Sequence, residues 1–237
     1  MEVMPPITTN LHDVQQRLNL AATAANRRPI DITLLAVSKT FPASAVREAY
    51  TAGQRHFGEN YVQEGVQKIE DLIDVRNELI WHFIGPLQSN KTQTVANHFD
   101  WVHSIDREKI AQRLNDQRPA NLPPLNVCVQ INISSETSKS GVNPTDALAL
   151  CQAITRMPHL TLRGLMSIPE PVEDPVLQRQ AHRQLKEIFE QIKQELNDST
   201  HFDTLSMGMS ADMEAAIAEG STIVRIGTAI FGKRNYS

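Results

Sequence analysis

The chain contains very little cysteine. Its 237 residues include only two, Cys128 and Cys151. They form no CxxC pair, so the sequence gives no sign of a disulfide framework or of a cysteine-ligated metal site. Cys128 lies in an apolar run typical of a strand and Cys151 in a helical pattern, and we expect both to be buried, unpaired thiols.

Long apolar runs and clusters of positive charge are also missing. No stretch approaches the ~18 apolar residues that a membrane-spanning helix needs. The first ten residues, MEVMPPITTN, have neither the basic start nor the apolar segment of a signal peptide. The net charge is −4 and lysine and arginine form no run, so we expect neither a nucleic-acid nor a membrane partner. These absences together indicate a cytoplasmic protein.

Several catalytic motifs are absent as well. The eight histidines are scattered and form no HExxH, so no metal site is expected. There is no GxSxG, and neither cysteine is placed as a nucleophile. No GxGxxG follows the first predicted strand, which disfavours an open dinucleotide-binding sheet.

What the sequence does contain is a regular alternation of short apolar runs and longer amphipathic ones. Such alternation predicts βα units with parallel strands. Eight units of this kind within about 200 residues favour a closed (β/α)8 barrel forming one domain over residues 1–237, with an open doubly wound sheet as the alternative. A helical pattern over Leu11–Asn26 could cover the place of the helix missing after the eighth strand. The predicted strands are Ile32–Thr40, His56–Asn60, Ile80–Pro86, Trp101–Ile105, Asn126–Ile133, Leu160–Pro169, Thr204–Ser210 and Ile223–Gly232.

The first predicted strand ends on a lysine, Lys39. In a (β/α)8 barrel the active face lies at the carboxyl ends of the strands. Side chains alternate along a strand, so Lys39 shares the face of Leu35 and Val37. If that face looks inward, the ammonium is partly desolvated, which lowers its pKa and favours the neutral amine that adds to an aldehyde. The alternative is a lysine that extends to water.

The segment from Ser206 to Gly220, SMGMSADMEAAIAEG, has features of an anion site. Ser210 is a candidate helix N-cap, and Gly208 would let a ligand approach the backbone. The loops after strands seven and eight are the usual phosphate site of this barrel, and strand eight adds Gly227 and Thr228. A capped helix also forms without any ligand, and Asp212 would disfavour an anion if its side chain faced the site.

Arg225 lies on the eighth predicted strand, on the same face as Gly227. An inward arginine stays charged and needs an acceptor. A ligand atom or a carboxylate from another strand would serve, and the sequence leaves both open.

Taken together, these strand-end motifs resemble the pyridoxal phosphate homeostasis protein family. The motifs that carry the resemblance are AVSKT (36–40), FGENYVQE (57–64), WHFIGPLQSNK (81–91), INIS (131–134), KSG (139–141), RGLM (163–166), LSMGMSADMEAAI (205–217) and VRIGTAIFG (224–232). The resemblance implies a barrel like the N-terminal domain of alanine racemase. It also implies that Lys39 holds pyridoxal 5′-phosphate (PLP) as an internal aldimine.

The resemblance further implies the roles of other residues. Arg225 would face the pyridine nitrogen, and Asn60 would lie near the ring or the imine. The phosphate would rest on the segments of strands seven and eight, around Ser206, Ser210, Gly227 and Thr228. The family's function is intracellular PLP homeostasis without robust catalysis, and PLP-dependent apo-enzymes are the candidate recipients.

Two enzymatic alternatives stay open at this point. One is a PLP-dependent amino-acid racemase of low activity. It would need a second base, which alanine racemases take from a further domain that we do not expect here. Tyr61 is the only tyrosine that is a candidate for this base, and we expect it instead to pack in the first turn of the next helix. The other is a Schiff-base aldolase. We also expect a monomer, and Lys139 in the polar loop Ser134–Gly141 is a candidate second amine.

Overall fold

The protein is a closed barrel of eight parallel strands surrounded by helices. The structure is a computed structural model that describes residues 6–134, 140–197 and 200–233. The strands follow one another around the barrel in chain order, and β8 pairs with β1 to close it. They are β1 (Thr33–Val37), β2 (His56–Glu59), β3 (Ile80–Phe83), β4 (Trp101–Ile105), β5 (Leu125–Gln130), β6 (Leu160–Met166), β7 (Thr204–Ser206) and β8 (Ile223–Ile226). The predicted (β/α)8 barrel is therefore confirmed.

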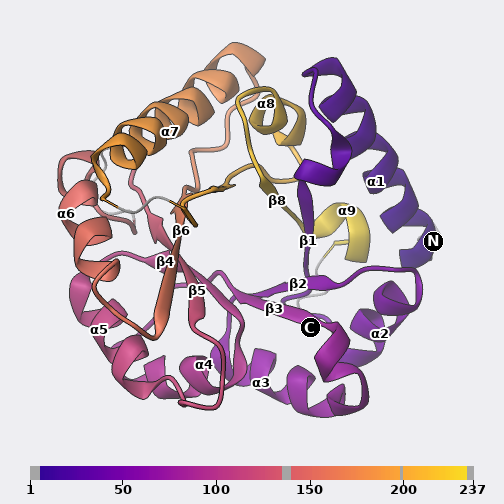
Figure 1. The fold of residues 1–237 in the computed structure, drawn as a ribbon. Helices are drawn as coiled ribbons and strands as arrows, with labels where there is room; N and C mark the ends of the chain where they lie inside the picture. The colour runs from indigo at the N-terminus through magenta and orange to yellow at the C-terminus, as the bar shows by residue number, and fades with distance from the viewer. Residues whose placement is uncertain (1–5, 135–139, 198–199, 234–237) are drawn as a thin grey trace.

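The helices form an outer ring around this barrel (Figure 1). They are α1 (Ile7–Ala24), α2 (Ala43–Thr51), α3 (Val62–Asp71), α4 (Thr92–His98), α5 (Glu108–Gln117), α6 (Pro144–Ile154), α7 (Pro175–Glu195), α8 (Met213–Ala218) and α9 (Thr228–Phe231). Short 3-10 turns cover Pro29–Asp31, Ile73–Glu78 and Ser89–Lys91. Among the described residues, no helix combines the length and the apolar character needed to cross a membrane.

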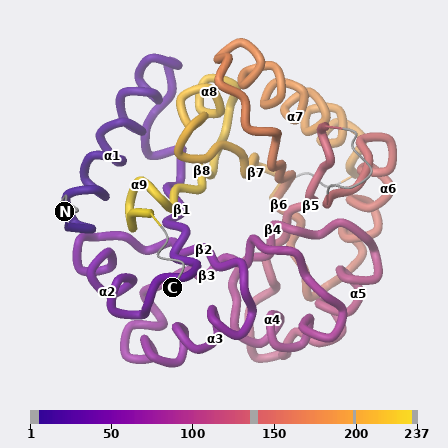
Figure 2. Tube along the Cα trace, turned by 180° about the vertical axis from the view of Figure 1, so that it is seen from behind, coloured from indigo at the N-terminus to yellow at the C-terminus, as the bar shows by residue number. Residues whose placement is uncertain are grey.

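Helix α1 occupies the position that the sequence left open. It lies between α8 and α2 in the ring, and the view from behind shows the same arrangement (Figure 2). It packs against α8, α9 and α2. The predicted cover by the N-terminal helix is confirmed.

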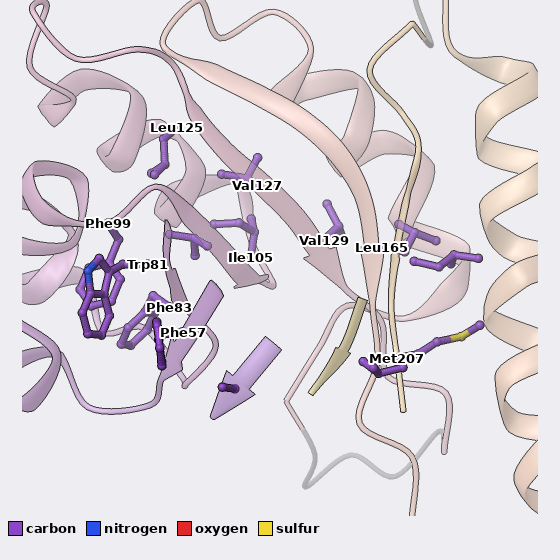
Figure 3. Packing of buried hydrophobic residues seen from close by; sticks show 14 of the residues in the cluster. Phe57, Trp81, Phe83, Phe99, Ile105, Leu125, Val127, Val129, Leu165 and Met207 are labelled. Carbon is purple, nitrogen blue, oxygen red and sulfur yellow. The ribbon is translucent and has the colours of Figure 1, made fainter. Parts of the chain in front are cut away.

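Two apolar layers explain why the strands carry almost continuous apolar sequence. The inner layer fills the barrel and includes Leu35, Val37, Trp101, Cys128 and Met166. The outer layer lies between strands and helices, and Figure 3 shows part of it, from Phe57 and Trp81 to Leu165 and Met207. Strands buried on both faces need apolar side chains on both.

Both cysteines are buried and free, as predicted. Burial raises the pKa of both thiols, and that of Cys151 rises to about 12. Neither group therefore has the thiolate character that a reactive cysteine needs.

Several predicted element ends differ from the structure. The eighth predicted strand, Ile223–Gly232, ends at Ile226, and the short helix α9 follows from Thr228. The seventh ends at Ser206 because Gly208 takes a positive φ of 94°, which extended strands do not use. Helix α8 begins at Met213 with Asp212 at the N-cap position, so Ser210 is not the helix cap.

Candidate functional site

A cavity opens at the carboxyl ends of the strands. Its volume is about 350 Å³, within the range of roughly 300–1,000 Å³ that small-molecule sites occupy. It brings together six of the seven predicted site residues: Lys39, Asn60, Ser210, Arg225, Gly227 and Thr228. Val37, Phe41, Ile84, Ile168 and Met209 are among the residues that supply its apolar walls. The site thus combines one primary amine, one guanidinium and several hydroxyl or amide groups in an apolar setting.

Lys39 reaches this cavity because of where β1 ends. Leu35 and Val37 lie in the inner layer of the barrel, and Lys39 continues their face two residues beyond Val37. The inward orientation predicted from the alternation is therefore confirmed. Thr40, the next residue, has a positive φ of 68°.

Arg225 is 4% exposed and is held by backbone oxygens. Its Nη1 donates to the Ser206 carbonyl at 2.6 Å and to Ser206 Oγ at 2.9 Å. Its Nη2 donates to the Ser167 carbonyl at 2.7 Å. Burial lowers the pKa of Arg225 to about 10, so the group stays charged at neutral pH. Carbonyl oxygens hold it, rather than the carboxylate that the sequence left open.

Behind Arg225, three histidines form a hydrogen-bonded row across the barrel interior. His56 Nδ1 lies 3.0 Å from His82 Nε2, and His82 Nδ1 lies 2.9 Å from His103 Nε2. His103 Nδ1 then lies 2.7 Å from Ser206 Oγ. This row, His56–His82–His103, links the Ser206–Arg225 pair to the opposite end of the strands.

The row consists of neutral imidazoles. Burial is the main cause that lowers the pKa of all three rings, and that of His103 falls to about 3. A neutral imidazole has one N–H and one bare nitrogen. Since Arg225 donates to Ser206 Oγ, the serine hydroxyl can donate its own proton to His103 Nδ1. His103 Nε2–H then donates to His82 Nδ1, and His82 Nε2–H donates to His56 Nδ1. Sequence reasoning placed His82 and His103 on strands but missed this row.

Ser206 therefore lies behind the cavity rather than in its wall. It is fully buried, and its hydroxyl oxygen bonds His103 and Arg225. Its predicted contact with a phosphate remains a prediction.

Asp212 does not line the cavity, and both of its carboxylate oxygens have partners elsewhere. Its Oδ1 accepts from the Met209 N–H at 2.6 Å and its Oδ2 lies 2.9 Å from His182 Nε2 on α7. The carboxylate thus fixes the loop that carries Ser210, and the objection that the sequence raised against an anion does not apply.

Asn60 presents an unpartnered acceptor. Its Oδ1 is buried without a hydrogen-bond partner among the described residues. The backbone of Asn60 is fixed by Gly85, where an added Cβ would lie 2.1 Å from the Asn60 carbonyl oxygen. Gly85 therefore has to be glycine for Asn60 to lie where it does.

Two other predicted residues do not join the cavity. Tyr61 is 55% exposed at the start of α3, so its expected packing is wrong. Lys139 lies outside the described residues, as do its neighbours 135–138. Apart from Lys39 and Arg225, no titratable side chain of the described residues lines this cavity. Glu170 lines a neighbouring cavity of about 330 Å³.

The chain is similar to known proteins over nearly its whole length. The profile of the "Alanine racemase, N-terminal domain" family matches residues 9–235. The Escherichia coli K12 "Pyridoxal phosphate homeostasis protein" is 58% identical over 235 residues, covering 99% of each chain.

Solved structures agree with these sequence matches. PipY of Synechococcus elongatus PCC7942, a COG0325 family member, was solved both without PLP and with PLP bound. The PLP-free structure is 36% identical with a TM-score of 0.85, and the PLP-bound structure is 35% identical with a TM-score of 0.81. Each match covers 95% of this chain and 100% of PipY. An alanine racemase of Corynebacterium glutamicum is 14% identical with a TM-score of 0.69, and the match covers 98% of this chain but 61% of the racemase. That likeness is one of fold alone.

Proposed function

Because the chain belongs to the alanine racemase N-terminal domain family, and within it to the pyridoxal phosphate homeostasis proteins, we propose that it binds PLP and serves the homeostasis of this cofactor. The observation that carries the proposal is the single cavity that unites Lys39 with Arg225, Asn60 and the Ser210 and Thr228 hydroxyls. The relative PipY, whose structure was solved with PLP bound, matches over 95% of this chain.

The residues of the cavity fit each chemical group of PLP. The aldehyde would be held by a primary amine, and among the described residues that line the cavity Lys39 is the one that carries such a group. The ring hydroxyl is a donor, and the buried Asn60 Oδ1 lacks a donor among the described residues. The phosphate requires hydrogen-bond donors, and the Ser210 and Thr228 hydroxyls lie beside Gly227, where the backbone is accessible.

Arg225 suits the pyridine nitrogen. Three of its five N–H bonds are used by Ser206 and Ser167, and the others have no partner among the described residues. A guanidinium only donates, so a ring nitrogen facing it has to stay unprotonated. When bound, PLP supplies an electron-withdrawing ring, and that property is weaker in the unprotonated form.

The same geometry favours a carrier over a racemase. A two-base racemase needs a second acid–base group across the substrate from Lys39. Among the described residues that line the cavity, Arg225 is the only other titratable group, and it stays charged. We therefore expect PLP to be held and released, with no more than trace racemisation of alanine.

The decisive experiment is absorption spectroscopy with borohydride reduction. The wild type incubated with PLP should show a visible band that borohydride abolishes, and peptide mapping should place the reduced label on Lys39. The Lys39→Ala variant should lose the band, while Lys109→Ala, an exposed lysine of α5, should keep it. A wild type that takes up no PLP, or a label spread over surface lysines, would refute the proposal and favour the aldolase reading.

A racemase assay separates the remaining alternatives. Steady formation of D-alanine from L-alanine by the PLP-loaded protein, absent in Lys39→Ala, would replace the carrier by an enzyme. The carrier reading predicts that PLP instead passes from the protein to an added apo-enzyme.

A further inference from the structure

A buried lysine, Lys68, lies directly behind the segment that carries Lys39. It is located on α3 and is 3% exposed. Its Nζ donates to Glu59 Oε1 at 2.8 Å, to Glu64 Oε1 at 2.7 Å and to the Ser38 carbonyl at 2.7 Å. An ammonium has three donors, and all three are engaged. We call Glu59, Glu64 and Lys68 the Lys68 cluster.

The Lys68 cluster holds both chain neighbours of Lys39. On one side, Ser38 accepts from Lys68 through its carbonyl and donates its hydroxyl to Glu59 Oε1 at 2.6 Å. On the other side, the Thr40 N–H donates to Glu64 Oε1. The peptide units on either side of Lys39 are therefore anchored to the same group of three charges.

The backbone conformation at Thr40 explains why such anchoring is needed. Thr40 has a φ of 68°, in the left-handed region. A β-branched residue rarely adopts it, and such a strained conformation persists only where the surrounding structure holds it. The Glu64 carboxylate fixes the peptide plane that precedes Thr40 by accepting the Thr40 N–H, and Lys68 holds that carboxylate in place.

Fold stability alone does not account for these buried charges. Removing a lysine and a glutamate from water is energetically costly, and apolar residues of the same size often stabilise a fold equally well. Glu59 Oε2 is buried without a partner among the described residues, and burial raises the pKa of this carboxyl despite the nearby Lys68. Such a cluster is better explained by the geometry that it fixes.

We propose that Lys68 is a positioning residue: with Glu59 and Glu64 it fixes the segment Ser38–Thr40 so that the amine of Lys39 is directed into the cavity. The inference rests on the proposed attachment of PLP to Lys39. Lys68 itself does not line the cavity, and its donors are occupied, so it is not a second attachment point.

The test compares two substitutions of the same kind on α3. Glu64→Gln removes the charge that joins Thr40 to Lys68 and leaves the Lys68–Glu59 pair intact. Glu70→Gln changes an exposed glutamate of the same helix. The rate of PLP attachment is followed by the visible band, and binding of 4′-deoxypyridoxine phosphate, which lacks the aldehyde, is measured by calorimetry.

We expect Glu64→Gln to slow attachment by about ten- to a hundredfold, since a misplacement of about 1 Å can slow a reaction about a hundredfold. Its affinity for the aldehyde-free analogue should stay at the wild-type value, because the cluster acts only on the lysine. Glu70→Gln should match the wild type in both measurements. Lys68→Met should slow attachment further; if it fails to fold, Glu64→Gln still decides the question.

The outcomes separate this proposal from the function on which it rests. If the wild type attaches no PLP at Lys39, the proposed function fails. If the wild type attaches PLP and Glu64→Gln does so at the same rate, the positioning role is refuted. An equal loss of attachment rate and analogue affinity would also refute it, because that pattern indicates general disruption of the site.

Discussion

His103 is a titratable side chain held neutral inside the barrel. It lies between His82 and Ser206, and its pKa falls to about 3 because burial, and then the charge of Arg225, disfavour the imidazolium. In the unfolded chain its pKa returns to about 6.5. Below pH 6.5 the unfolded state therefore binds a proton that the folded state does not.

This difference predicts an acid-sensitive stability. The free energy of unfolding should fall as the pH falls from 6.5 towards 3, with His103 contributing up to about 1.4 kcal/mol per pH unit. The contribution is absent above pH 6.5, where both states are neutral. His56 and His82, whose pKa values are also lowered by burial, should add to the same trend.

The measurement is urea unfolding of the wild type and His103→Asn at several pH values. The variant should be less stable at pH 7.5, because Ser206 and His82 lose a partner, but its stability should depend less steeply on pH below 6.5. Equal slopes for the two proteins would contradict a neutral, buried His103.

At the scale of the element, α1 replaces the outer helix that the βα repeat does not supply after β8. Leu18 is fully buried on its inner face, whereas Leu20, two residues further, is 71% exposed. Arg27, after the helix, donates to the Ile217 carbonyl at the end of α8 at 2.9 Å. Helix α1 is thus an integral part of the barrel wall.

A pair of leucine truncations tests this role of α1. Leu18→Ala should lower the free energy of unfolding by about 2–5 kcal/mol, since it leaves a cavity in the outer layer. Leu20→Ala should change it by no more than about 0.5 kcal/mol, as expected of an exposed position. Thermal and urea unfolding of both variants measure the difference, and equal effects would show that α1 is not packed as described.

The elements also show how far sequence reasoning reached. All eight strands were predicted because parallel strands buried on both faces carry apolar runs, as in Trp101–Ile105, which was bounded correctly. Their ends were predicted less well, because apolar sequence continues past the last residue of a strand, as it does after β8 where helix α9 follows. The turn into α9 after Gly227 has no local sequence signal that distinguishes it from more strand.

The same contrast holds for the site. Lys39, Asn60 and Arg225 were predictable because strand ends of a parallel barrel share one face. The His56–His82–His103 row and the Lys68 cluster were missed because their members lie on different elements of the barrel. Strand register brings the three histidines together, and the packing of α3 against the barrel brings Glu64 and Lys68 to Glu59 of β2.

At the scale of the whole molecule, the cavity joins residues from both ends of the chain. Lys39 follows the first strand and Thr228 the last, and β1 and β8 pair to close the barrel. A ligand that contacts both sides of this seam binds only the folded barrel. Its binding therefore stabilises the fold by mass action, by about 2.7 kcal/mol when its free concentration is a hundred times its dissociation constant.

This linkage predicts rises of different size in the unfolding midpoint for three combinations of protein and ligand. PLP should raise the unfolding midpoint of the wild type most, because the amine, the ring and the phosphate are all engaged. With Lys39→Ala the shift should be smaller but present, because the contacts proposed for Arg225, Ser210 and Thr228 with the ring and the phosphate remain. Pyridoxal, which lacks the phosphate, should shift the wild type less than PLP does. Thermal unfolding at increasing ligand concentration measures all three.

If Lys39→Ala gave no shift at any PLP concentration, the covalent bond alone would hold the cofactor, and the phosphate contacts proposed for the β7 and β8 ends would be wrong. If instead pyridoxal raised the unfolding midpoint of the wild type as much as PLP does, the phosphate would contribute nothing to binding. The proposed phosphate contacts would then also be wrong.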